Sequence, residues 1–170
     1  MLDFLFRRLT ADPQRGATLF EAITRAARRP HWYVEGEIAD TIDGRFAVLA
    51  TVAALVLVRL ESEGARGDAA SVAVTERFVE VMESEHRELG LGDPTLGKTV
   101  RRLVGSLARR TALWRIAVAD PAEWIAATRG SLYKRGVAAE ALDHSAEALK
   151  RLWARLTAAG IQSLEEGKLE

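Results

Sequence analysis

The residues that most resemble a catalytic motif lie in the middle of the chain, at Gly92–Thr99. Their letters, GDPTLGKT, fit the phosphate-loop pattern G-x-x-x-x-G-K-[ST]. A phosphate loop leaves a β-strand, so that its amides converge on the nucleotide, and its helix begins near the lysine. Here the preceding segment has helical periodicity, and Asp93-Pro94 is typical of a helix start. We therefore predict that Gly97 and Lys98 lie inside a helix, and nucleotide binding stays only an alternative.

A second pattern, Glu83-Ser84-Glu85-His86, puts a carboxylate and an imidazole on one helical face. Di-iron bundles need a second Glu-x-x-His and two further glutamates from other helices. The other histidines, His31 and His144, have no glutamate three residues earlier. The chain also has no cysteine and no G-x-S-x-G serine. We therefore expect no catalytic residue, no metal site and no cofactor.

The elements around these residues are predicted to be helices. Three prolines follow aspartate, at Asp12-Pro13, Asp93-Pro94 and Asp120-Pro121. Apolar residues recur at spacings of three, four and seven, and no alternating strand pattern competes with them. The prediction is an all-α, single-domain bundle of about six to seven helices around a central apolar helix. The expected ranges are 17–29, 44–62, 69–89, 94–117, 121–129 and 135–159, with a turn at Gly64, Gly67 and Asp68.

Composition narrows the class of protein. The 170 residues carry 24 basic and 24 acidic side chains, and this neutral total argues against a general nucleic-acid binder. The longest apolar run, Phe46–Val58, is short of the ~20 residues of a membrane span. We expect a short amphipathic segment at 1–14, packed on the body or on a membrane surface, a helical domain at 15–160 and a frayed charged tail at 161–170. The N-terminus does not have the pattern of a signal peptide, so we expect a soluble monomer that is peripheral to a membrane at most.

Two regions could form a recognition surface. The first is the loop Pro30–Asp43, in which Trp32 and Tyr33 are followed by Asp40 and Asp43. These aromatics either plug the core, with Asp43 capping the next helix, or they meet a partner.

The second region is the segment after Pro94, which carries six cations and no acid before Ala119. It is either a solvated face paired with the acidic segment before it or a contact for an acidic or ribosome-associated partner. The six cations are Lys98, Arg101, Arg102, Arg109, Arg110 and Arg115.

Both regions resemble the ubiquinol–cytochrome c chaperones, which are assembly factors for cytochrome b. One family pattern is similar to the first region. It consists here of Arg29-Pro30-His31-Trp32-Tyr33, then Asp40-Thr41-Ile42-Asp43-Gly44-Arg45-Phe46 and an apolar helix ending at Arg59-Leu60. A second family pattern is similar to the second region and to the residues just before it. It consists here of Arg87-Glu88-Leu89-Gly90-Leu91-Gly92-Asp93, then Gly97-Lys98 and Arg101-Arg102. The chain departs from the family at Val81-Met82-Glu83 and at Leu107-Ala108-Arg109-Arg110.

The resemblance implies a non-catalytic helical chaperone that binds newly made cytochrome b and assists assembly of ubiquinol–cytochrome c reductase. It also implies a bacterial, cytoplasmic member, peripheral to the inner membrane on its cytoplasmic side, that contacts the ribosome or membrane surface through the basic helix. A helical adaptor for an unrelated client is the remaining alternative. The candidate client-binding residues are Trp32, Tyr33, Asp40, Asp43, Arg45, Lys98, Arg101 and Arg102.

Overall fold

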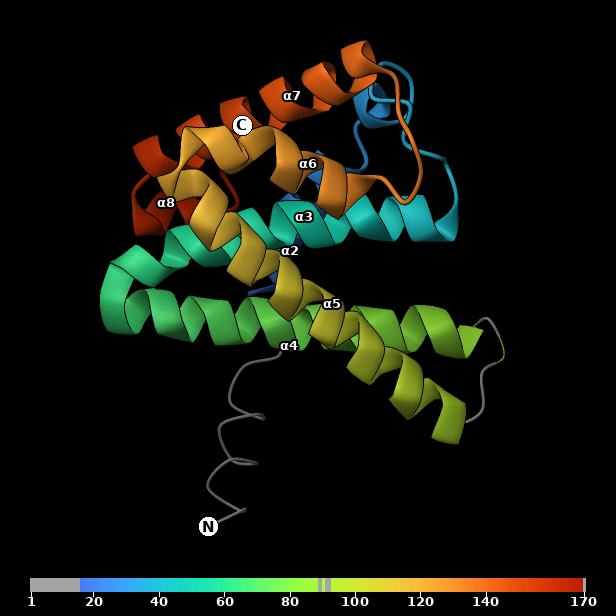
Figure 1. Ribbon diagram of the computed structural model, residues 1–170. Helices are drawn as coiled ribbons and strands as arrows, with labels where there is room; N and C mark the ends of the chain where they lie inside the picture. Colours follow the sequence, from blue (N-terminus) through green and yellow to red (C-terminus); the bar gives the residue numbers. More distant parts are fainter. Residues whose placement is uncertain (1–15, 89, 91–92, 170) are drawn as a thin grey trace.

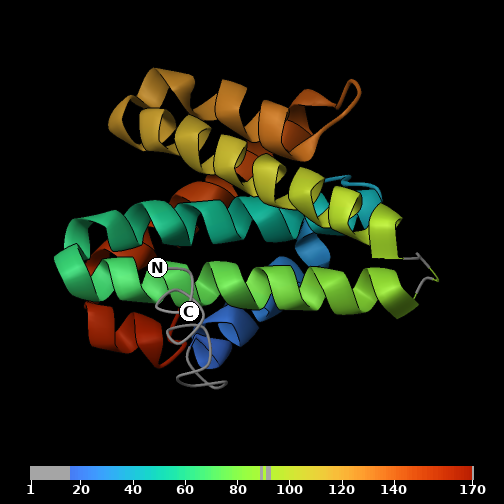
Figure 2. The same ribbon diagram turned by 90° about the horizontal axis from the view of Figure 1, so that it is seen from below.

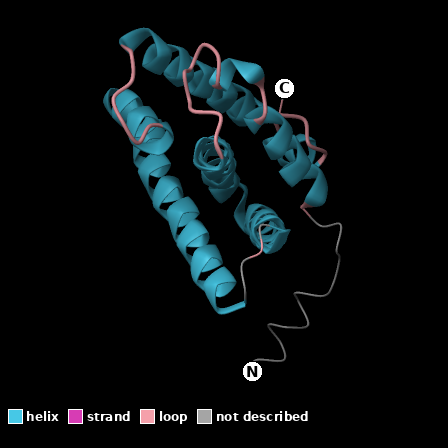
Figure 3. Ribbon diagram, turned by 90° about the vertical axis from the view of Figure 1, so that its right-hand side faces the viewer, coloured by secondary structure: helices cyan, strands magenta, loops and turns pink. Residues whose placement is uncertain are grey.

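The computed structural model describes residues 16–88, 90 and 93–169, and all of its described elements are helices joined by loops (Figures 1 and 3). This confirms the predicted all-α fold. The α-helices are α2 (Ala17–Ala27), α3 (Ile42–Leu60), α4 (Gly64–Glu88), α5 (Asp93–Ala119), α6 (Trp124–Leu132), α7 (Ala139–Ala158) and α8 (Ile161–Glu165). Three short 3-10 turns join them: η1 (Pro30–Trp32), η2 (Glu61–Glu63) and η3 (Pro121–Glu123).

The centre of the fold is α3, as predicted. From Val48 to Val56, only Leu49 is not fully buried, because α2, α4, α5, α6 and α7 all pack against this helix. A helix that is apolar on every side is stable only inside such a shell. In Figures 1 and 2, α4 runs back alongside α3, and α5 crosses both.

The start of α3 is held by local polar contacts. Thr41, and not Asp43 as expected, caps the helix, because its hydroxyl accepts a hydrogen bond from the Gly44 amide at 3.2 Å. Gly44 lies so close to the preceding loop that a Cβ atom there would be 1.9 Å from the Ala39 carbonyl oxygen. The Asp-Thr-Ile-Asp-Gly-Arg pattern therefore encodes a tight turn into the central helix.

The connections around α4 and α5 differ in part from the prediction. Gly64, with φ +57°, makes the turn before α4 almost alone, so the helix already includes Gly67. The backbone of α5 begins at Asp93, which confirms that Asp93-Pro94 starts a helix. Asp120 accepts a hydrogen bond from the Ala122 amide at 3.0 Å and so caps η3. The N-terminal segment 1–14, with Asp12-Pro13, lies outside the described residues.

Residues 161–169, which were expected to form a charged, frayed tail, pack on the body of the protein in the structure. Helix α8 packs on α2 and α4, and both Leu164 and Leu169 are buried. Gly167, with φ +74°, packs so closely that an added Cβ would be 3.0 Å from the Thr18 carbonyl oxygen. The segment carries Glu165, Glu166 and Lys168, but its two leucines decide its position because they are buried in the core.

The end of α7 is capped by a residue that is distant in sequence. Arg59, near the end of α3, is almost buried, and it donates to the carbonyl oxygens of Leu156 and Ala159, both at 2.9 Å. Both carbonyls lie at the C-terminal end of α7, where carbonyl oxygens have no hydrogen-bond donor within the helix. Arg59 also pairs with Glu63 at 2.6 Å, so its buried charge is compensated.

Candidate functional site

Two loop aromatics close the C-terminal end of α2. The indole of Trp32 donates to the Ala26 carbonyl oxygen at 2.9 Å, and the hydroxyl of Tyr33 donates to that of Ala27 at 3.0 Å. Both carbonyls lie in the last turn of α2, where they lack helical partners. Trp32 is 3% exposed, so of the two roles open to it the structure favours core support. Tyr33 is half-buried, and its ring faces a groove.

The same loop is tied to the far side of the molecule. The Tyr133 hydroxyl donates to the Gly36 carbonyl oxygen at 2.7 Å and is also within 2.7 Å of the Ser145 hydroxyl. Nearby, the His31 and His144 rings are joined through Nδ1 and Nε2 at 3.1 Å. Burial, followed by repulsion from His144, lowers the pKa of His31. The loop that follows α2 is therefore held rigidly against α7.

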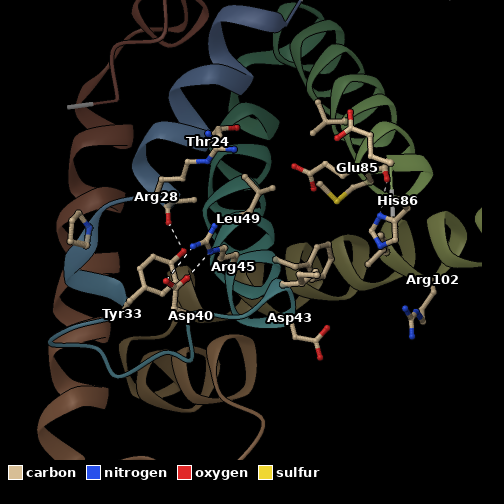
Figure 4. A pocket seen from close by; sticks show the side chains of 18 of the residues that line it. Thr24, Arg28, Tyr33, Asp40, Asp43, Arg45, Leu49, Glu85, His86 and Arg102 are labelled. Carbon is tan, nitrogen blue, oxygen red and sulfur yellow. Dashed lines mark hydrogen bonds and ion pairs between the residues drawn. The ribbon is translucent and has the colours of Figure 1, made fainter. Parts of the chain in front are cut away.

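A groove of about 950 Å³ opens between this loop, α2, α3, α4 and α5 (Figure 4). Its floor and sides are largely apolar. Two apolar side chains at its edge face solvent, Val34 at 68% and Ile42 at 64% exposure. The other apolar lining residues are Ala27, Pro30, Tyr33, Phe46, Leu49, Val81, Met82 and Leu103. An exposed apolar cavity of this size is typical of a binding surface.

The rim of the groove is charged. Arg45 and Asp40 form a bidentate pair, with an Nε–Oδ1 distance of 2.6 Å, and this hydrogen bond lowers the pKa of the Asp40 carboxyl. Asp43 pairs with Lys134 at 2.6 Å, and that contact lowers the Asp43 pKa. Arg102 reaches the same rim from α5. Five predicted residues, Tyr33, Asp40, Asp43, Arg45 and Arg102, thus lie around one cavity.

The basic helix divides into two groups. Lys98, Arg101, Arg102 and Arg109 are exposed, and none of them forms an ion pair with another described residue. Lys98 and Arg101 do not line the groove.

The other two of the six cations, Arg110 and Arg115, interact with residues outside α5. Arg115 pairs with Glu61 of η2 at 2.5 Å. Arg110 is half-buried, donates to the Ser131 carbonyl oxygen at 2.9 Å and lies 5.7 Å from the centre of the Phe46 ring. Burial lowers the pKa of Arg110. Both side chains therefore connect helices, leaving the exposed charge on the first half of α5 and at Arg109.

The chemical alternatives lose their structural basis. The segment before the phosphate-loop pattern is α4, a helix, and Gly97 and Lys98 lie inside α5. The described part of the chain contains no strand that could carry such a loop. Nδ1 of His86 lies 2.8 Å from the Met82 carbonyl oxygen, an ordinary contact within a helix. Among the described residues, no three potential metal ligands come together.

Sequence reasoning missed the apolar residues that make the groove. Val34, Ile42 and Phe46 come from the loop and the start of α3, whereas Val81 and Met82 come from α4. Met82 is a buried apolar residue of α4, so helical periodicity alone would assign it to the core. One feature of the sequence could have indicated Val34 and Ile42 as groove residues. Both are large apolar residues in a stretch that is otherwise rich in turn formers and charges.

Comparison with known proteins first defines the fold. The crystal structure of the Cbp3 homolog from Brucella abortus superposes with a TM-score of 0.76. The two sequences are 24% identical, over 98% of this chain and 94% of that one. No curated protein matches the chain.

The family follows from sequence. The model of the ubiquinol-cytochrome C chaperone family matches residues 35–169. The chain therefore belongs to this family of chaperones, as the two motifs predicted. Among the described residues, none of the helices is both long and apolar enough to cross a bilayer.

Proposed function

We propose that this protein binds newly made cytochrome b and holds it for assembly into ubiquinol–cytochrome c reductase. The observation that carries the proposal is the apolar groove, most of whose lining residues belong to the family-matched region of the chain. Cytochrome b is a membrane protein, so its apolar helices need cover until they are assembled. A groove with an apolar floor and a charged rim can cover such a helix by helix-in-groove packing. This function requires binding and release, and no bond is made or broken.

The predicted residues take different parts in this proposal. Tyr33 and Arg102 contact the client at the groove, and Asp40 with Arg45 keeps the loop in place at its mouth. Asp43 holds Lys134 and thereby joins the start of α3 to the segment after α6. Lys98 and Arg101 extend the positive surface beyond the groove, where they attract the ribosome or anionic headgroups on the cytoplasmic side of the inner membrane.

The test is capture of cytochrome b by tagged protein from detergent-solubilised bacterial cells. The groove variant is V34D/I42D, and the matched control is V72D/I116D. Val72 and Ile116 are 57% and 60% exposed, so the control adds the same charge at equally exposed sites that do not line the groove. All four side chains face solvent, and both variants are expected to keep wild-type helicity.

We expect the groove variant to capture cytochrome b at least about tenfold less well, since burying an Ile or Val contributes about 1.5–3 kcal/mol. The control should capture it normally. Equal capture by both variants would remove the groove from the function, and recovery of a different protein in place of cytochrome b would support an unrelated adaptor. Capture that is unchanged in R101E/R102E would remove the basic surface from the mechanism.

A further inference from the structure

One side of the groove carries two carboxylates that the fold itself does not use. The α4 side consists of Val81, Met82, Glu85, His86 and Glu88, a spacing that puts these side chains along one face of the helix. Glu85 and Glu88 are exposed, and neither forms an ion pair with another described residue. Figure 4 shows Glu85 and His86 across the groove from Tyr33 and Asp40.

The position of these carboxylates is unfavourable for the isolated protein. They belong to the last turn of α4, where the helix dipole favours positive charge and disfavours negative charge. Arg87 is in the same turn but does not line the groove. A cation supplied from outside would offset both the dipole and the repulsion between the two glutamates.

The acidic rim residues outside α4 are paired within the molecule. Asp40 and Arg45 neutralise each other, and Asp43 has Lys134 as its partner and Arg102 in its field. Arg28, which follows the last residue of α2, is placed where a cation stabilises the end of a helix. Arg28 and Arg102 also have no ion pair with another described residue, so the groove has free charge of both signs, and its free negative charge is that of Glu85 and Glu88 on the α4 side.

We propose that the groove binds the positively charged end of an apolar helix: its last turns fill the apolar floor, and the Lys or Arg residues that follow pair with Glu85 and Glu88. This inference rests on the proposed function and specifies the segment that is held. Membrane helices carry Lys and Arg mainly on their cytoplasmic flanks. The protein therefore recognises the cytoplasmic end of a client helix.

The test compares two fluorescein-labelled peptides by anisotropy with the full-length protein. Both contain about eight apolar residues (Leu and Ala), roughly two helical turns, and they end in Lys-Lys or in Glu-Glu. The groove variant is E85K/E88K. The matched control is E80K/E83K, which makes the same charge change with the same spacing on the same helix, outside the groove. Circular dichroism and thermal melting establish that both variants are folded.

We expect wild type and the control to bind the Lys-Lys peptide about fivefold more tightly than the Glu-Glu peptide, as two exposed ion pairs allow. Salt should reduce this preference, and E85K/E88K should abolish or reverse it. A preference for Glu-Glu, or the same loss of preference in both variants, would overturn the inference.

The outcome also separates this inference from the proposed function. If wild type binds both peptides equally and V34D/I42D binds both more weakly, the charge preference is overturned but binding of apolar helices in the groove is supported. If neither peptide binds and V34D/I42D still captures cytochrome b normally, the inference and the proposed function both fail.

Discussion

Replacing Arg59 by methionine tests whether one buried side chain joins the central helix to α7. Methionine keeps much of the aliphatic volume of arginine but has no donor. The variant loses donation to the Leu156 and Ala159 carbonyl oxygens, both at 2.9 Å, to the Ser62 hydroxyl at 2.8 Å and to Glu63 at 2.6 Å. The carbonyls cannot find partners within α7, because they lie in its last turn.

The expected cost follows from these contacts. A hydrogen bond from a charged donor contributes about 1.5–3 kcal/mol to the stability of the folded protein. This stabilisation is lost when the donor is removed and the buried acceptor has no other partner. Leu156 is buried, whereas Ala159 is partly exposed and can reach water. We therefore expect the free energy of unfolding to fall by about 3 kcal/mol. With a urea dependence of about 2 kcal/mol per molar, the midpoint falls by about 1.5 M.

The assay is urea unfolding followed by circular dichroism, and Arg66→Met is the control. Arg66 also forms a bidentate pair, with Glu165, but its side chain is 55% exposed. Loss of an exposed pair costs less than about 1 kcal/mol. If R59M lowers the midpoint no further than R66M does, the capping role assigned to Arg59 is wrong.

Two further predictions concern backbone space and pH. Gly44→Ala should lower the melting temperature markedly, because the added Cβ would overlap the Ala39 carbonyl oxygen. Gly97→Ala is the control: it has open space within a helix and should stabilise the protein by about 0.5–1 kcal/mol. Equal melting temperatures of the two variants would contradict this prediction. The pKa of His31 is lowered from 6.5 in the folded protein, so His31 binds fewer protons there than in the unfolded chain. The contribution of His31 to stability should therefore be present above pH 6.5 and decline below it. Melting curves at pH 7.5 and about pH 5.5 should show a smaller decline for His31→Gln, and an unchanged decline would exclude His31 as its source.

Much of the fold could be predicted because it depends on local rules. The apolar run from Phe46 to Val58 has no polar face, so it had to lie at the centre of the bundle. Asp93-Pro94 and Asp120-Pro121 marked helix starts because aspartate and proline suit the free amides there. The same rule argued against a phosphate loop, since a helix beginning at Asp93 leaves no loop around Lys98.

The groove could not be predicted to the same extent, because it depends on contacts between distant segments. Composition marked Tyr33 and Asp40 as candidates, but periodicity does not show that Met82 lies in the same cavity. The pair of Asp43 with Lys134 spans 91 positions, and that of Arg59 with Leu156 spans 97. Such partners are fixed by helix packing, which single-sequence patterns do not encode.

The buried C-terminal leucines place a constraint on the order of synthesis. Leu164 and Leu169 are buried, and α8 packs on α2 and α4, yet a ribosome makes this segment after the helices that it covers. Folding is therefore finished only after translation has passed these residues. A chain that ended before residue 161 would leave apolar surface of α2 and α4 exposed, which would lower its stability and raise the unfolded fraction that chaperones and proteases process in cells.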